Sequence, residues 1–216
     1  GRRLGIDTLV DYASQFGLGE PTGIELPEAI GHMSSPEYSE SIGEIWNPGD
    51  VLQTSIGQSK SLFTPLQLAT YTATLANGGV RMKTHLVKSI KSYALDETVE
   101  DIEPEVVVDM GLSGTAVSGM IRASGQNGYS GTSGAYFGDY PISVASKTGT
   151  PETTSFPNGT YICYAPAEDP QIAVAVVIEN GYHGYWGAAV AKAIFDEYFF
   201  GKTNDQLPTA ADTLLP

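Results

Sequence analysis

The sequence is poor in cysteine and in basic residues, and both shortages exclude certain kinds of site and partner. Its 216 residues contain one cysteine, Cys163, which excludes an internal disulfide and a cysteine-rich metal site. Eleven basic residues against 25 acidic ones give a formal net charge of −14, which disfavours nucleic acid or an anionic membrane surface as a direct partner. The three histidines, His32, His85 and His183, have no mutual metal-ligand spacing. We therefore expect no metal, no cofactor and no nucleic acid.

Long apolar segments are also missing. No run of about 18 apolar residues occurs, and the opening Gly1-Arg2-Arg3-Leu4-Gly5 lacks the apolar region of a signal peptide. The remaining composition, 41% apolar and 17% charged, is ordinary for a soluble globular fold with a sizeable core. The composition predicts one soluble domain.

Helix signals occur at several places. Thr64-Pro65-Leu66-Gln67 combines a capping box with a proline in the first turn, and it predicts a helix that ends near Asn77. Asp7 is placed to cap an earlier helix that Gly17 would end. The apolar positions between 106 and 123 predict a further helix with a break near Gly111, and the last helix is expected over 188–200.

The expected strands and connections fill the rest of the chain. The sequence predicts three successive antiparallel strands, separated by turns, over residues 144–149, 161–165 and 171–179. One or two further strands are expected over residues 80–90. The stretch from Gly19 to about Pro48 predicts a long surface connection. Acidic residues between 94 and 105 predict an exposed excursion without chemistry.

The strand ending in Lys147-Thr148-Gly149-Thr150 is the best candidate for a site. Alternation places Ser146 and Thr148 on one face, and Lys147 and Gly149 on the other. Such an edge presents an ammonium group, hydroxyls and a backbone N–H to an anionic, peptide-like ligand, and glycine lets that ligand approach the backbone. A lone Lys-Thr-Gly triplet is a weak signal, and an exposed strand end is the alternative interpretation.

Neighbouring motifs make the pattern more specific. Five stretches follow one another along the chain: Asp50 to Ser59, Thr64 to Ala69, Lys147-Thr148-Gly149, Tyr164-Ala165-Pro166-Ala167 and Ile172 to Gly184. With these motifs, in the family's order, the chain resembles class B penicillin-binding proteins over about Gly1 to Phe200.

The resemblance implies an α+β fold, in which helices lie on both faces of an antiparallel sheet. This is the transpeptidase fold that penicillin-binding proteins share with serine β-lactamases, present here in part. Residues 1–200 would form the C-terminal portion of that domain, and 201–216 a C-terminal tail. The implied function of the full-length protein is that of a peptidoglycan D,D-transpeptidase, which acts on stem peptides ending in D-Ala-D-Ala and is acylated by β-lactams. It would work at the extracytoplasmic face of a bacterial membrane, held by an N-terminal anchor outside this sequence.

The resemblance also assigns roles to the candidate site residues. Lys147 would set the electrostatics of a proton relay, Thr148 and Thr150 would bind the substrate carboxylate beside Gly149, and the Thr150 N–H would supply half of an oxyanion hole. The family's Ser-x-x-Lys and Ser-x-Asn motifs are absent from the sequence. We therefore expect the chain alone to lack the nucleophilic serine and to be inactive. One position departs from the family: Ser59 stands where glycine is frequent.

Two other functions remain open at this point. A serine β-lactamase or a β-lactam-sensing receptor shares the Lys-Thr-Gly strand, although Thr64-Pro65-Leu66-Gln67 after Gly57-Gln58 favours the transpeptidase. A noncatalytic scaffold for wall-synthesis partners is the second alternative. The family's sheet places two earlier strands beside the C-terminal strand, so strand 171–179 is expected to be an open edge that favours self-association.

Overall fold

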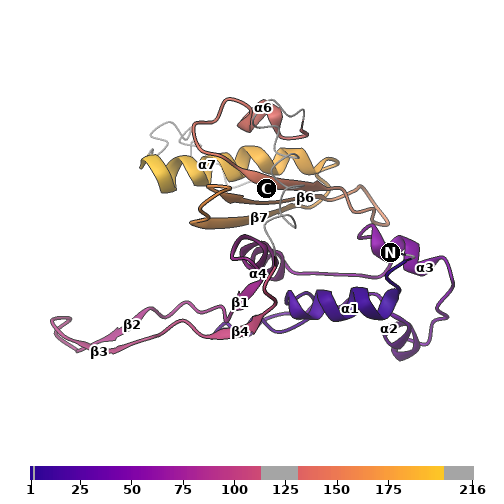
Figure 1. The fold of residues 1–216 in the computed structure, drawn as a ribbon, viewed down its shortest axis with the longest axis horizontal. Coiled ribbons are helices and arrows are strands. Elements are labelled where there is room, and N and C mark those ends of the chain that lie inside the picture. The colour runs from indigo at the N-terminus through magenta and orange to yellow at the C-terminus, as the bar shows by residue number, and fades with distance from the viewer. Residues whose placement is uncertain (2, 113–130, 202–216) are drawn as a thin grey trace, which may run out of the picture.

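The fold has a sheet layer above a layer of short helices, from which a hairpin projects (Figure 1). The computed structural model describes residues 1, 3–112 and 131–201. Within these residues, runs of consecutive helices are followed by runs of consecutive antiparallel strands, which confirms the expected α+β class. The expected tail, 201–216, lies outside the described residues apart from Gly201.

The upper layer contains the three-stranded sheet that the sequence predicted. Strands β5 (Ala145–Gly149), β6 (Gly159–Ala165) and β7 (Ile172–Ile178) pair antiparallel in that order. The register places Lys147 opposite Ile162 and Gly149 opposite Thr160. The sheet therefore leaves β5, with the candidate site, at one edge and β7 at the other.

The last helix, α7 (Gly187–Phe200), covers one face of this sheet (Figure 1). Every second residue of β6, beginning with Tyr161, points to that face, as the period of a strand requires. The preceding short elements, α6 (Gly134–Phe137) and the 3₁₀ helix η2 (Gly184–Trp186), border it. The core on this side contains Phe137, Val144, Tyr161, Cys163, Ala165, Val174, Ala188, Ala191 and Phe195.

The opposite face packs on α4 (Pro65–Ala76), the helix predicted from its capping box. Both bonds of the box are present: the Gln67 N–H donates to Thr64 Oγ1 at 3.2 Å, and the Thr64 N–H donates to Gln67 Oε1 at 3.0 Å. Leu75 packs against Ala145 and Tyr164 of the sheet. The helix therefore links the sheet to the lower layer.

The lower layer contains α1 (Ile6–Gln15), α2 (Pro36–Ser41) and α3 (Asp50–Ser55). Two sequence predictions are corrected here. Asp7 does not cap α1, because it lies inside the helix, which begins at Ile6. Gly5 occupies the N-cap position, and no side chain makes a capping hydrogen bond there. The expected surface connection contains α2, whose first turn is capped by the Ser35 side chain accepting from the Tyr38 N–H.

Four short strands form two separate hairpin-like pairs. Strand β1 (Val80–Met82) pairs with β4 (Val106–Asp109), and β2 (Ser89–Lys91) pairs with β3 (Thr98–Asp101). The helix predicted from residue 106 is therefore wrong over β4, because pairing with β1 decides the structure of these β-branched residues. The rest of that prediction, from residue 113 onward, lies outside the described residues.

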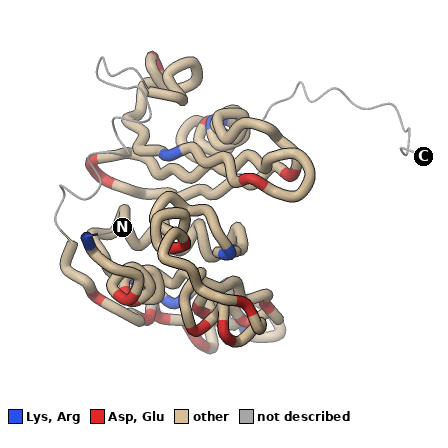
Figure 2. The backbone as a smooth tube through the Cα atoms, turned by 90° about the vertical axis from the view of Figure 1, so that its right-hand side faces the viewer, with Lys and Arg blue, Asp and Glu red and all other residues tan. Residues whose placement is uncertain are grey.

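Within the described part of the chain, no helix has the length and apolar character needed to cross a membrane. Charge is spread over both layers, and Asp and Glu visibly outnumber Lys and Arg (Figure 2).

The free edge of β7 gives a first prediction for the isolated 216-residue chain. In the described residues β7 pairs with β6 only, and its sequence, IAVAVVI, contains no charged residue or proline that would discourage another strand. We propose that the isolated chain self-associates through β7. Light scattering should find dimers or larger species, and hydrogen exchange should be slow along both edges of 172–178. A stable monomer whose outward β7 amides exchange fast would contradict this proposal.

Candidate substrate-binding edge

The candidate site lies along the outer edge of β5. Because β5 ends the sheet, the backbone groups on its outer side have no strand neighbour among the described residues. Val144, Ala145 and Ser146 are buried, whereas Lys147 is exposed and Thr148 and Gly149 are half-buried. The strand is therefore anchored at its start and accessible at its end, where the charged and hydroxyl groups lie.

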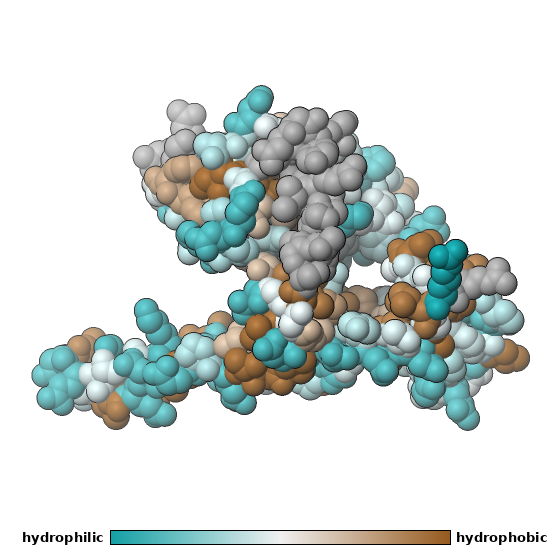
Figure 3. Space-filling model, viewed as in Figure 1, coloured by the Kyte–Doolittle hydropathy of each residue, from teal (hydrophilic) through white to brown (hydrophobic). Residues whose placement is uncertain are grey.

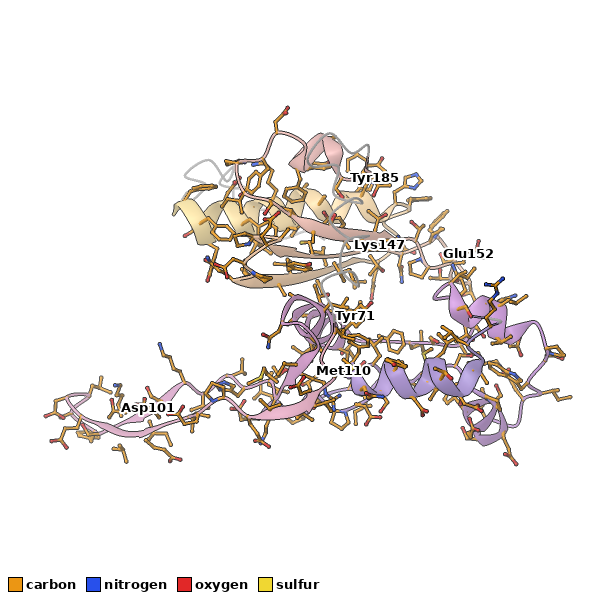
Figure 4. The ribbon with its side chains drawn as sticks, viewed as in Figure 1. Tyr71, Asp101, Met110, Lys147, Glu152 and Tyr185 are labelled. Atoms are coloured by element: carbon orange, nitrogen blue, oxygen red, sulfur yellow. The ribbon has the colours of Figure 1, made fainter. Side chains whose placement is uncertain are left out.

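Lys147 lies on the face of the sheet that packs on α4. Its neighbour at alternate spacing, Ala145, contacts the α4 cluster, and Figure 4 shows Lys147 on the same side of the sheet as Tyr71 of α4. The Lys147 ammonium donates to the Thr148 carbonyl oxygen at 2.7 Å. Within the part of the chain that the structure describes, the Lys147 ammonium pairs with no carboxylate, so its positive charge is available to a ligand.

The opposite face of β5 is held by hydroxyl groups from the segment before α6. Tyr161 donates from its hydroxyl to Ser133 Oγ at 3.1 Å, and Ser133 Oγ lies 3.2 Å from Ser146 Oγ. All three residues are fully buried, and burial raises the pKa of the Tyr161 hydroxyl well above its ordinary value, so it stays a donor. Thr132 Oγ1 approaches Thr148 Oγ1 at 3.3 Å. These contacts fix the strand that carries Lys147.

Gly149 and Thr150 form the end of the edge, where η2 packs against it. A methyl group added at Gly149 would meet Thr160 only at ordinary contact distance, 3.5 Å, so packing inside the fold does not require glycine there. Thr150 Oγ1 accepts a long hydrogen bond, 3.4 Å, from the Gly184 N–H. Its own hydroxyl proton remains free to donate to a ligand.

Together these groups suit one kind of ligand. An open strand edge pairs with an extended peptide through main-chain hydrogen bonds. An ammonium group and two hydroxyls at the end of that edge bind a carboxylate. The arrangement therefore fits an extended peptide with a carboxylate near the residues that pair with β5.

Comparison with known proteins shows the family to which the chain belongs. Residues 1–199 match the family model for the penicillin-binding protein transpeptidase domain. The chain belongs to this family. It spans only about a third of the length of the curated relatives that it matches, with 28%, 33% and 37% for the first three.

Individual relatives agree with the family. The chain is 30% identical to the peptidoglycan D,D-transpeptidase MrdA of Acinetobacter baumannii, over 96% of this chain and 33% of that protein. Its fold matches a structure of Pseudomonas aeruginosa PBP2 in complex with WCK 5153, with a TM-score of 0.78, 32% identity, and coverage of 92% of this chain and 43% of the other. It also matches an imipenem acyl-enzyme complex of penicillin-binding protein A from Mycobacterium tuberculosis, with a TM-score of 0.70, 30% identity, and coverage of 90% and 43%. The predicted family and fold are confirmed.

The sequence motif points to the four candidate residues of the strand end, but no motif predicted the groups that contact them. Thr132 and Ser133 lie in a stretch rich in glycine and serine, which has no periodicity to interpret. Gly184 was noted only as part of a motif, and its close packing on Gly149 was not predicted. The available signal for Thr132 and Ser133 was only that two hydroxyl residues are adjacent, since α6 separates them from β5 along the chain.

Cys163 gives a second prediction. Its side chain is fully buried in the α7 core, and this burial raises the pKa of its thiol far above the ordinary value. Because the thiolate is the reactive form, the native protein should not react with a thiol reagent such as dithionitrobenzoate at pH 8, whereas the urea-unfolded protein should react fully. Fast, stoichiometric labelling of Cys163 in the native state would show that this core opens readily.

Proposed function

We propose that the chain forms the substrate-binding edge of a peptidoglycan D,D-transpeptidase. The full-length protein would cross-link stem peptides that end in D-Ala-D-Ala, and β-lactams would acylate it. The single observation that carries this proposal is the open edge of β5, which ends in an exposed Lys147 followed by Thr148, Gly149 and Thr150. Membership of the transpeptidase family and similarity to MrdA support the same activity.

Each residue of the edge has a proposed role. The carboxylate of the terminal D-Ala, or that of a β-lactam, binds the hydroxyls of Thr148 and Thr150. The Thr150 N–H donates to the carbonyl oxygen that becomes negatively charged when a nucleophile attacks, as one of two donors of an oxyanion hole. Gly149 lets the ligand backbone lie close to β5. Lys147 supplies positive charge beside the groups that transfer the proton.

The nucleophile lies outside this sequence. No lysine has a serine three residues before it, so none of the serines is placed as a Ser-x-x-Lys nucleophile. In the proposed reaction a serine from the rest of the protein attacks the carbonyl of the last peptide bond. The terminal D-Ala leaves with the transferred proton, and the acyl group then passes to an amine of a second stem peptide.

The proposed setting follows from the same function. Peptidoglycan lies outside the cytoplasmic membrane, so the site would act on the extracytoplasmic face. We propose that an anchor elsewhere in the full-length protein holds it there.

Fluorescent-penicillin labelling tests this function. The full-length protein should give a labelled band that an excess of unlabelled penicillin removes, and the isolated 216-residue chain, run beside it, should remain unlabelled. Failure of the full-length protein to label would contradict the proposed acyl transfer. Slow spontaneous loss of the label favours a transpeptidase, whereas rapid turnover of penicillin would assign the site to a β-lactamase.

A further inference from the structure

A projecting arm is the most exposed part of the described chain. It comprises residues 86–105 and contains the β2–β3 hairpin, which extends away from both layers (Figure 1). Within the described residues, these two strands pack extensively only against each other. The arm is fixed at its base, where the Glu25 carboxylate accepts from the Leu86 N–H at 2.9 Å and Lys83 pairs with Glu105 at 2.9 Å.

The arm exposes apolar side chains that no described element covers. Tyr93 is fully exposed at its tip, and Leu95 and Val99 are 77% and 68% exposed. Figure 3 shows a few hydrophobic patches, coloured brown, between hydrophilic residues along the projection. A two-stranded hairpin is at best marginally stable in water without a third strand or a packing face. The arm therefore gains stability from a partner that covers it.

The backbone of the arm favours a strand as that partner. A two-stranded sheet has two open edges, and half of the N–H and C=O groups of each strand point outward. All four residues of β3 are exposed.

The negative charge of the arm favours a positively charged partner. Residues 86–105 contain two basic residues, Lys88 and Lys91, and six acidic residues. All six acidic residues lie in the half of the arm that contains β3. They are Asp96, Glu97, Glu100, Asp101, Glu103 and Glu105. A second copy of the arm would bring like charges together along β3, unlike the uncharged edge of β7. Acidic partners and anionic lipids are disfavoured for the same reason.

From these observations we infer that the arm is a docking site for another protein, which adds an extended segment with alternating basic and apolar residues to the edge of β3. Main-chain hydrogen bonds would complete a three-stranded sheet. Lys or Arg side chains of the segment would pair with the acidic side chains beside β3, and its apolar side chains would cover Val99 and its neighbours. This inference does not depend on the acyl-transfer chemistry of the β5 edge.

Three labelled peptides test the inference with the full-length protein in fluorescence anisotropy. The first alternates Lys and Val over seven residues. The second keeps its charges but has proline at the central valine, which blocks strand pairing. The third alternates Glu and Val. We expect the first peptide to bind at least about tenfold tighter than either of the others, and to slow hydrogen exchange within 98–101. Equal binding of the first two peptides, or no protection of β3, would overturn the inference.

Charge-reversed variants locate the binding. Glu97→Lys combined with Glu100→Lys should weaken binding of the Lys-Val peptide by about tenfold or more, because both side chains are exposed on the arm. The matched control, Asp11→Lys with Glu197→Lys, changes net charge equally at exposed positions on α1 and α7 and should change binding less than about twofold. Equal losses in the two variants would show that binding follows net charge, and would overturn the inference. Unchanged penicillin labelling verifies that each variant is folded.

Discussion

Replacing Lys147 with alanine in the full-length protein should lower the second-order rate constant for acylation by penicillin by about 100-fold or more. The reason is electrostatic: a fixed charge beside a group that gains or transfers charge in the transition state is typically worth about 3 kcal/mol or more. The fold should not change, because the Lys147 side chain is exposed and donates its hydrogen bond to the carbonyl oxygen of the adjacent Thr148.

Stopped-flow or gel-based acylation kinetics would measure this effect. Lys88→Ala is a matched control, since Lys88 is also an exposed lysine but lies on the arm, far along the chain from β5. It should acylate at the wild-type rate. An unchanged rate for Lys147→Ala, with the melting temperature preserved, would remove Lys147 from the mechanism.

The second large effect is expected from Gly184→Ala, which places a methyl group where no space exists. An added Cβ would lie 2.2 Å from the Gly149 carbonyl oxygen and 2.5 Å from the Thr160 carbonyl oxygen. Both are backbone atoms of the sheet, so relief requires η2 to move away from the end of β5. Overpacking of this kind costs about 1–3 kcal/mol, and we expect the upper end of that range because no flexible side chain can yield.

This substitution should also slow acylation, since a shift of about 1 Å in a binding edge can cost roughly 100-fold in rate. Thermal unfolding and acylation kinetics of the full-length protein would measure the two consequences. Gly49→Ala is the control: Gly49 is exposed, has a helical backbone and has no atom within 4 Å of an added Cβ. A Gly184→Ala protein with wild-type stability and rate would show that η2 does not fix the edge.

Local signals were sufficient to predict the sheet and its two covering helices. Each of these elements carries its own evidence in sequence: alternation for β5, turns between the three strands, a continuous apolar run for β7, and a capping box with proline for α4. The same kind of signal was available for α2, where Ser35 precedes Pro36, but it was outweighed by the scarcity of apolar residues. Elements fixed by their own residues are predictable.

Elements whose structure depends on residues far away in the chain could not be predicted from their own sequence. Val106 to Asp109 forms a strand because β1, more than 20 residues earlier, pairs with it. The hydroxyl groups of Thr132 and Ser133 reach the site only because the chain returns beside β5. Ser59, where the family often has glycine, has a φ of 72°, a left-handed conformation that glycine adopts without strain. Its hydroxyl lies 3.0 Å from Ser34 Oγ, a contact that glycine could not make.

Peptide mapping of the acylated full-length protein would show directly which residue forms the acyl-enzyme. The protein would be incubated with penicillin, digested and analysed by tandem mass spectrometry to locate the modified residue. We expect one acyl group per molecule, on a serine of a Ser-x-x-Lys motif outside these 216 residues, with β5 supplying the binding edge. An acyl group on any serine within the 216 residues, or a full-length protein that acquires none, would contradict it.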